Sequence, residues 1–342
     1  MPVRGTSRPV VAIVAAFMAA GLLLALTAGC SLGCSLFPGS ARLRLGTQPG
    51  IYIAPYLIAQ EQGYFDGARV TIKETSFPTT AAAIDALASG AVDAAYLGAT
   101  PAIIAASEDS GLVIIAICDR SDGGEGIVAR YGAGIAAPAD LKGKRVAVAK
   151  GSNAHRFLLE VLAGAGLAPD RDVTLLDMTA EDQVAALQAE SVDAVATWEP
   201  YLTKACATGG SVLVDDAHAA LPTYHVIVAR RAYVKRRPAA VQAFLAGHFR
   251  GAAFKASDPP VAAAIVAGCL SMSLNDVEAT LRLFTHPDVN LELGPDFLGP
   301  PGEKAKNDIG RLAAFLAEQG LIAAAPDVLV DSSIVKALAV ER

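Results

Sequence analysis

The sequence predicts an α/β protein made of two similar lobes, and an internal repeat is the main reason. Residues 84–94 can be laid over residues 184–194, with Asp93 over Asp193. Each copy has the pattern of a helix that leads into a short apolar strand and then a turn. Strands alternate with helices through most of the chain, which is typical of lobes with largely parallel or mixed sheets. A small ligand held between the two turns would explain the duplication.

The first 29 residues have the features of a signal peptide. Two arginines precede an uncharged apolar run at residues 10–26, and small residues follow it directly before Cys30. Small residues before a cysteine resemble a bacterial lipobox, in which Cys30 is lipidated and becomes the mature N-terminus, with Cys34 as a second candidate. The alternative is a membrane anchor, because the apolar run is nearly long enough to span a bilayer. We therefore expect a lipoprotein signal peptide at 1–29 and a lipidated tether at 30–41.

Composition limits the classes of function. Removing 29 of the 342 residues leaves 313, enough for about two domains at ~150 residues each. A net charge of −6 with scattered lysines and arginines argues against a nucleic-acid surface. Cys118, Cys206 and Cys269 are expected to be buried free thiols. His218 and His225 have no partners at metal-ligand spacing, so we predict neither a metal nor a cofactor.

The first half of the chain is predicted to form most of lobe 1. We expect strands at 42–46, 70–74, 94–97, 112–118 and 127–130, and helices at 52–65, between Thr80 and Asp93, and from about Thr100. Thr79 or Thr80 is the natural N-cap of the second helix. Gly123 to Gly126 is predicted to be a loop, because three of its four residues are glycine.

A second unit begins near Pro138. Its expected strands are 144–149, 173–177, 191–198 and 212–215, its helices 154–164 and 180–190, and a returning strand follows at 223–229. Helices are then expected at 238–255, 260–270, 274–284 and 303–319. With crossings at 127–134 and 222–228, lobe 1 is predicted to comprise 42–130 plus 226–342, and lobe 2 to comprise 131–225.

Five turns recur where a strand ends and a helix begins. They lie at 48–50, 76–80, 98–100, 151–153 and 198–200. In open α/β sheets ligands bind outside the carboxyl ends of strands, and helix N-termini favour anions there. The alternative for each turn is helix capping alone, because Ser and Thr are the usual caps. Convergence of the five turns would make a binding site.

Three further residues have two interpretations each. Trp198, the only Trp in the chain, is either core or the wall of a cleft; a strand-to-helix turn favours the wall. Glu199 either complements the dipole of the following helix or receives an amine of the ligand. Glu125, between glycines, has the same ambiguity.

The motifs together resemble the nitrate/sulfonate/taurine class of solute-binding proteins of ABC importers. The resemblance covers roughly residues 42–255 and rests on the order and spacing of eight stretches: Gln48–Gly50, Ala54–Tyr56, Ala59–Phe65, Ala86–Asp93, Leu97–Pro101, Pro138–Val148, Gly151–His155 and Trp198–Tyr201. It implies a type II periplasmic-binding-protein-like fold, with two α/β lobes joined by two hinge strands around a cleft. By motif match it gives pocket roles to Gln48, Gly98, Thr100, Ser152, Asn153 and Trp198.

The candidate ligand-binding set combines those matches with the neighbouring turn residues. It comprises Gln48, Gly50, Tyr52, Phe77, Thr79, Gly98, Thr100, Glu125, Ser152, Asn153, Trp198 and Glu199. The acid at Glu125 departs from the family pattern and is unfavourable for a simple oxyanion, which leaves room for a zwitterion such as taurine or for a neutral heterocycle. Stacking on Trp198, Tyr52 and Phe77 would suit a pyrimidine, as in relatives that bind thiamine precursors.

The resemblance also implies partners and a location. We expect a non-enzymatic, monomeric, exported lipoprotein on the outer face of a bacterial membrane, delivering a small solute to an ABC permease and its ATPase. A periplasmic enzyme on the same fold is the alternative from a different class. The cysteine-rich segment of the related thiamine-pyrimidine synthases is not found here, which makes the enzyme the weaker hypothesis.

Overall fold

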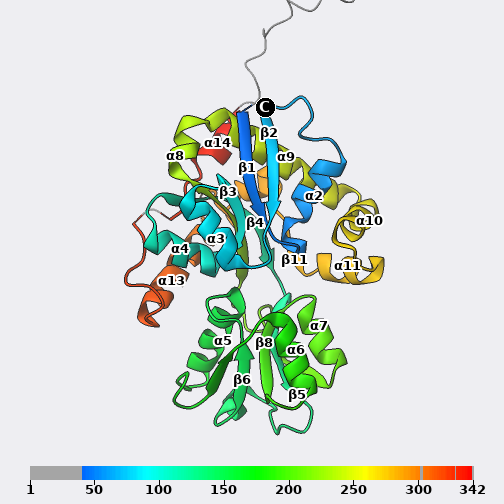
Figure 1. Ribbon diagram of the computed structural model, residues 1–342, viewed down its shortest axis with the longest axis vertical. Coiled ribbons are helices and arrows are strands. Elements are labelled where there is room, and N and C mark those ends of the chain that lie inside the picture. The colour runs from blue at the N-terminus through cyan, green and yellow to red at the C-terminus, as the bar shows by residue number, and fades with distance from the viewer. Residues whose placement is uncertain (1–40, 301–302, 328, 341–342) are drawn as a thin grey trace, which may run out of the picture. The chain divides into compact units, whose positions relative to one another are not determined.

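The structure is a computed structural model that describes residues 41–300, 303–327 and 329–340. The predicted signal peptide, Cys30, Cys34 and the tether up to residue 40 lie outside the described residues. The described part is a mixed α/β fold with two separate sheets, as predicted (Figure 1). We call each sheet, with the helices that pack on it, a lobe.

The sheet of lobe 1 has six strands. They are β1 Ala41–Thr47, β2 Val70–Ser76, β3 Ala94–Gly98, β4 Leu112–Ser121, β10 Thr223–Arg230 and β11 Phe284–Thr285. Their order is β11-β4-β10-β3-β1-β2. β1 pairs in parallel with β2 and β3, whereas β10 runs antiparallel between β3 and β4. The carboxyl ends of β1 and β3 therefore lie at the same edge of this sheet.

The sheet of lobe 2 has five strands. They are β5 Glu125–Arg130, β6 Arg145–Val148, β7 Thr174–Asp177, β8 Ala194–Trp198 and β9 Gly210–Asp215, in the order β7-β6-β8-β5-β9. β6 pairs in parallel with β7 and β8, and β5 is antiparallel to β8 and β9. Glu125 opens β5 and lies opposite Trp198, the last residue of β8.

The crossings between the sheets differ from the expected ones. The chain passes from β4 to β5 at residues 122–124 and from β9 to β10 at residues 216–222. The expected division assigned residues up to 130 to lobe 1, whereas β5 belongs to the second sheet, and Glu125 and Gly126 are strand residues rather than loop. An apolar strand does not reveal in its sequence which sheet it will join, because pairing is decided by distant partners.

Helices cover both sheets. Their bounds are η1 Ile51–Ile53, α2 Ala54–Glu61, α3 Thr80–Ser89, α4 Ala99–Glu108, η2 Pro138–Leu141, α5 Asn153–Gly164, α6 Ala180–Gln188, α7 Tyr201–Ala207, α8 Arg231–Arg236, α9 Pro238–Ser257, α10 Pro259–Leu270, α11 Leu274–Leu281, α12 Val289–Glu292, α13 Lys304–Glu318 and α14 Ser333–Val340. The oxygens of Thr79, Ser152 and Thr179 accept backbone hydrogen bonds at the starts of α3, α5 and α6. These caps explain why the three helices begin where they do.

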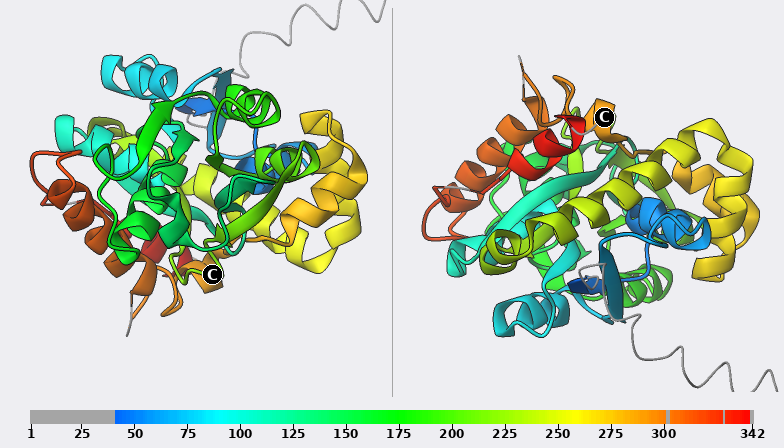
Figure 2. Two further views of the ribbon diagram at one scale, coloured as in Figure 1. Left: turned by 90° about the horizontal axis from the view of Figure 1, so that it is seen from below. Right: turned by 90° about the horizontal axis from the view of Figure 1, so that it is seen from above.

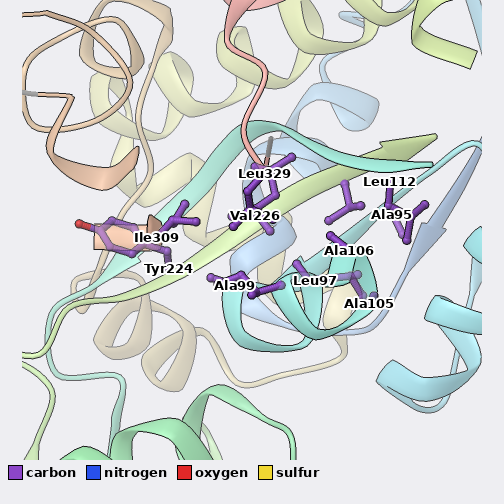
Figure 3. Close-up of a cluster of buried hydrophobic side chains, with 14 of the residues drawn as sticks. Ala95, Leu97, Ala99, Ala105, Ala106, Leu112, Tyr224, Val226, Ile309 and Leu329 are labelled. Atoms are coloured by element: carbon purple, nitrogen blue, oxygen red, sulfur yellow. The ribbon is translucent and has the colours of Figure 1, made fainter. Parts of the chain in front are cut away.

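Each face of the first sheet has its own core. On one face, Leu97 of β3 and Val226 of β10 pack with residues of α4 and α13 such as Ile309 (Figure 3). On the other face, Tyr56 of α2 and Phe244 of α9 are fully buried beneath the sheet. The yellow-green helix α9 runs along this face (Figure 2). Burial of each such side chain contributes about 1.5–3 kcal/mol, so the two cores hold the strand ends of lobe 1 in place.

The internal repeat extends to individual hydrogen bonds. In lobe 1 the Asp93 carboxylate accepts hydrogen bonds from the Arg44 backbone N–H at 3.0 Å and from its Nε at 2.9 Å. In lobe 2 the Asp193 carboxylate accepts hydrogen bonds from the Arg145 backbone N–H at 2.9 Å and from its Nε at 3.2 Å. In each lobe the aspartate lies just before a strand, β3 or β8, and the arginine lies on the parallel neighbour of that strand, β1 or β6. The two lobes therefore share this Asp–Arg contact as well as the repeat in their sequences.

Two further findings concern expectations from composition. The three cysteines in the described part are free, but only Cys118 is buried, while Cys206 is partly buried and Cys269 is exposed. No single helix among the described residues is long and apolar enough to cross a bilayer, although α10 and α11, bent by 118° at their junction, pass that test as a pair.

Candidate functional site

Asn153 connects the two lobes at their strand ends. As the first residue of α5, it accepts a hydrogen bond at Oδ1 from the Thr100 backbone N–H at 3.0 Å. Its Nδ2 donates to the carbonyl of Tyr224 at 3.1 Å. A Cβ atom on Gly98 would lie 2.8 Å from that Nδ2, so glycine permits the close approach. The motif residues Gly98, Thr100 and Asn153 are thus brought together from two lobes.

Glu125 lies buried beside this connection. Burial raises the pKa of its carboxyl to about 8; Asp216 adds to the rise, while His225, Arg156 and Asn153 oppose it. The carboxyl therefore carries a proton at neutral pH and can donate a hydrogen bond. This removes much of the expected repulsion of an oxyanion, because a protonated carboxyl has no charge.

Besides one carboxylate oxygen each of Asp119 and Asp216, two polar atoms in this region lack a partner in the described part of the chain. They are Oγ1 of Thr100 and Oε2 of Glu125, both buried. Buried polar groups are nearly always hydrogen-bonded, so such atoms mark places where water or a ligand binds. Both belong to residues expected to bind the ligand.

His225 was not among the predicted site residues, yet it lies in the same region. Its ring stacks on Tyr52 with centroids 4.6 Å apart and planes 10° from parallel. Its Nδ1 is 2.9 Å from the Asp119 carboxylate, which is fully buried. Burial lowers the pKa of His225, but the charge of Asp119 and its hydrogen bond outweigh burial, and the net shift is upward. The alternating pattern of 223–229 predicted a strand and did not indicate that His225 lies at the candidate site.

Arg156 and Asp216 tie the two crossings to the lobes. The Arg156 guanidinium, buried on α5, donates to Thr223 Oγ1 at 2.6 Å and to the carbonyl of Pro222 at 3.5 Å. Asp216 accepts a hydrogen bond from the Gly123 backbone N–H at 2.7 Å. A buried cation of α5 therefore contacts the 216–222 segment, and a buried acid of that segment holds 122–124. Both lie close to the connection between the lobes.

The predicted residues of the first turns lie around Tyr52. The hydroxyl of Tyr52 donates to the carbonyl of Gln48 at 3.2 Å. The Gln48 side chain accepts from Thr80 Oγ1 at 3.1 Å, so it joins this turn to the start of α3. A Cβ atom on Gly50 would lie 2.5 Å from the Tyr52 ring. Glycine at position 50 therefore leaves space for that aromatic ring.

Three other predicted residues act within their own elements. Phe77 packs on the core of lobe 1, with ring atoms 3.1 Å from where a Cβ on Gly46 would be. Thr79 caps α3 and is exposed. Ser152 caps α5 by accepting a hydrogen bond from the His155 N–H at 3.1 Å. For Thr79 and Ser152 the geometry is the capping alternative described above.

Trp198 and Glu199 differ in what they contact. Trp198 is partly exposed and lies edge-on to Tyr201, with ring centroids 6.2 Å apart. Glu199 accepts hydrogen bonds from Thr203 Oγ1 at 2.8 Å and from the Thr203 N–H at 3.3 Å. Burial raises the pKa of Glu199, and the Thr203 hydrogen bonds oppose this. Its carboxyl is engaged by the first turn of α7, while Trp198 keeps an accessible surface.

Other parts of the described chain offer less for a ligand. A surface hollow at the start of α6 is lined by Asp177, Met178, Thr179, Asp182 and Ala186. Two carboxylates line it, which is unfavourable for an anion. No group of three metal-ligating side chains occurs among residues 41–300, 303–327 and 329–340.

Comparison with known proteins decides the family. A model of the NMT1-like family matches residues 38–271, more than half of the chain. The chain belongs to the NMT1-like family. This confirms the family resemblance seen in the motifs.

Individual relatives of this NMT1-like protein are named as binding proteins. It is 33% identical over 175 residues to a putative aliphatic sulfonates-binding protein of Escherichia coli K12, covering 51% of this chain and 54% of that one. It is 30% identical over 194 residues to the taurine-binding periplasmic protein of the same organism, covering 56% and 59%. The chain thus spans little more than half the length of these relatives.

Solved structures extend the likeness over most of the chain. The periplasmic aliphatic sulphonate binding protein SsuA of E. coli has a TM-score of 0.69 at 27% identity, covering 84% of this chain and 90% of that one. The desulfurization enzyme DSZB has a TM-score of 0.67 at 18% identity, covering 88% and 99%, which shows a shared fold alone. The type II periplasmic-binding fold is therefore confirmed, and the same fold also occurs in an enzyme.

Proposed function

We propose that this NMT1-like protein is the extracytoplasmic solute-binding subunit of an ABC importer, taking a small sulfonate, taurine or nitrate-type anion between its lobes. The observation that carries this proposal is the polar cluster where the lobes meet, formed by the buried residues Thr100, Glu125 and Asn153 together with the partly buried His225. Its available groups are mostly hydrogen-bond donors, which suits an anion. The names of the relatives support the same class of solute.

We further propose that the chain works as a monomeric lipoprotein attached through Cys30. An ABC permease and its ATPase would receive the solute. Binding without catalysis is the proposed role because two relatives matched in sequence are named as binding proteins. Mass spectrometry of the solute after long incubation should recover it unchanged. A converted product would favour the enzyme alternative.

A direct titration tests the ligand class. Taurine, ethanesulfonate, nitrate and a neutral pyrimidine would each be titrated into the protein while Trp198 emission and thermal stability are followed. A true ligand at ~100 times its dissociation constant should add about 2.7 kcal/mol of stability. Because the chain has one Trp, any saturable change in emission reports on its surroundings.

A heteroaromatic solute is the second candidate. The stacked Tyr52 and His225 rings form an aromatic surface, and a protonated Glu125 can donate to a ring nitrogen. Saturable binding of the pyrimidine with no response to any of the anions would favour this candidate and contradict the first.

A further inference from the structure

We infer that His225, positioned by Asp119 and Tyr52, is the cationic hydrogen-bond donor for the anionic group of the ligand, and that its protonation makes binding dependent on pH. This inference rests on the proposed binding role and identifies a residue that determines specificity within that site. Neither the family motifs nor the strand-end turns include His225.

The geometry fixes which ring nitrogen is available. Nδ1 of His225 faces the Asp119 carboxylate at 2.9 Å, so a proton on Nδ1 is always favoured. Among residues 41–300, 303–327 and 329–340 the hydrogen bond of this ring runs through Nδ1, to Asp119, and the side chain is 15% exposed. The stack on Tyr52 holds the ring plane in place. Nε2 is thus the atom that can meet a ligand.

The charge state of His225 decides whether Nε2 donates or accepts a hydrogen bond. In the imidazolium form Nε2–H donates a charge-assisted hydrogen bond, which favours an oxyanion. In the neutral form Asp119 keeps the proton on Nδ1, so Nε2 presents a lone pair that repels an oxyanion. Anion binding at this atom therefore requires protonated His225.

Several charged or titratable groups surround the ring. Asp119 faces it from β4 and Asp216 from the 216–222 crossing, and both favour the imidazolium; Glu125 of β5 does so once it is ionised. Tyr52 stacks on one side, and Phe284 of β11 lies near the ring.

Two basic groups lie behind Asp119. Burial and the charge of Lys255 lower the pKa of His286, which therefore stays neutral. The Lys255 amine, whose pKa burial lowers to about 8, lies 2.8 Å from His286 Nδ1 and donates to the carbonyl of Phe284 at 2.7 Å. On the opposite side, Arg156 acts on Glu125 and Asp216. The net effect raises the pKa of His225, so the imidazolium persists to higher pH than in an ordinary histidine.

The test is a calorimetric titration of the full-length protein with ethanesulfonate at pH 6 and pH 9. We expect wild type to bind at least tenfold more weakly at pH 9. His225→Gln, which keeps a neutral donor of similar size, should weaken binding at pH 6 by about ten- to a hundredfold. It should also reduce the pH dependence to the part that comes from ionisation of Glu125. Asp119→Asn should move the pH midpoint of binding downward, which a purely structural role would not do.

A matched control is available in the same chain. His218 also contacts an aspartate, with its Nδ1 2.7 Å from Asp215, but its side chain is 83% exposed. His218→Gln should leave both affinity and pH profile unchanged. If His225→Gln fails to fold, the ¹⁵N resonance of His225 Nε2 in wild type decides: ethanesulfonate should shift it and should raise the pKa read from its titration.

The outcomes separate this inference from the proposed function. If His225→Gln binds ethanesulfonate as tightly as wild type at pH 6 and loses as much affinity as wild type at pH 9, the role of His225 is overturned and the proposed function stays intact. Wild type that binds a neutral pyrimidine but no anion overturns both.

Discussion

At the scale of the residue, burial governs the ionisation of several carboxyls. Glu292 on α12 is fully buried, and its Oε1 accepts a hydrogen bond from the Ile117 N–H at 2.8 Å. Burial raises its pKa to about 8, and that one hydrogen bond opposes the rise. Oε2 has no partner in the described part of the chain. Glu292 and Glu125 therefore both hold a proton far above the pH at which an exposed glutamate loses it.

This predicts that stability falls as pH rises. A glutamate whose folded pKa is raised contributes stability that is complete below its unfolded value, about 4.5, and is lost as pH rises through about 8. Glu292→Gln is neutral at every pH, so the decline of unfolding free energy between pH 5 and 8 should become shallower, by on the order of 1 kcal/mol per pH unit. Denaturant melts across this range measure it.

The control for that series is Glu318→Gln, because Glu318 is exposed on α13. Its melts should follow wild type at every pH. A Glu292→Gln protein with the wild-type slope would show that the carboxylate is ionised in the folded state throughout.

The sequence revealed part of the candidate site and could not reveal the rest. Gly98, Thr100 and Asn153 lie at strand-to-helix turns, a local signal that survives in the fold. His225 lies inside an alternating strand, where it looks like any other half-buried residue. Its role comes from Asp119 and Tyr52, which are distant in sequence and meet it only through sheet pairing and packing.

At the scale of the element, helix caps could be predicted from the sequence, whereas the pairing of strands into sheets could not. The cap at Thr79 follows from side-chain chemistry next to a helical pattern. The helix expected at 52–65 begins with a 3₁₀ turn and ends at Glu61. Short elements such as α8, α12 and β11 were missed, since two to six residues carry too little periodicity. β5 was assigned to the wrong sheet because its partners are far away in sequence.

One close contact between elements depends on glycine. A Cβ atom on Gly251 of α9 would lie 1.9 Å from the carbonyl oxygen of Pro55 and 3.2 Å from the backbone N of Ala59. Both belong to α2, so the two backbones touch at this point. Backbone atoms cannot rotate away as a side chain can, so the helices would have to separate.

Gly251→Ala should therefore destabilise the fold by about 1–3 kcal/mol, the usual cost of overpacking. The matched control is Gly310→Ala on α13, where an added Cβ meets nothing within 4 Å. There alanine should stabilise by up to about 1 kcal/mol through helix propensity. Equal thermal shifts in the two variants would contradict the close contact between α2 and α9.

At the scale of the whole molecule, duplication was the most informative signal. The equivalence of Asp93 and Asp193, visible in the sequence, became two matching Asp–Arg connections in two sheets. The number of lobes followed from that repeat. Their boundaries did not, because a crossing is defined by which strands pair.

Attachment to the membrane is the remaining prediction at this scale. From the small residues before Cys30, we expect Cys30→Ala to abolish fatty-acid labelling and membrane retention. The two sheets are built from residues 41 onward, so the melting temperature of the released protein should not change. Fractionation and labelling with a tagged fatty acid measure both. Labelling that survives in this variant would point to Cys34 instead.

The connection made by Asn153 has a consequence for kinetics. Its two hydrogen bonds to lobe 1 join protein groups, and each is worth about 0.5–1.5 kcal/mol net. Breaking both adds roughly 1–3 kcal/mol to the cost of parting the lobes, so only a small fraction of molecules is open at any moment. A solute that can enter only an open molecule binds with an apparent affinity reduced by that fraction. At high solute concentration the rate of binding is then limited by the rate at which the lobes open rather than by diffusion.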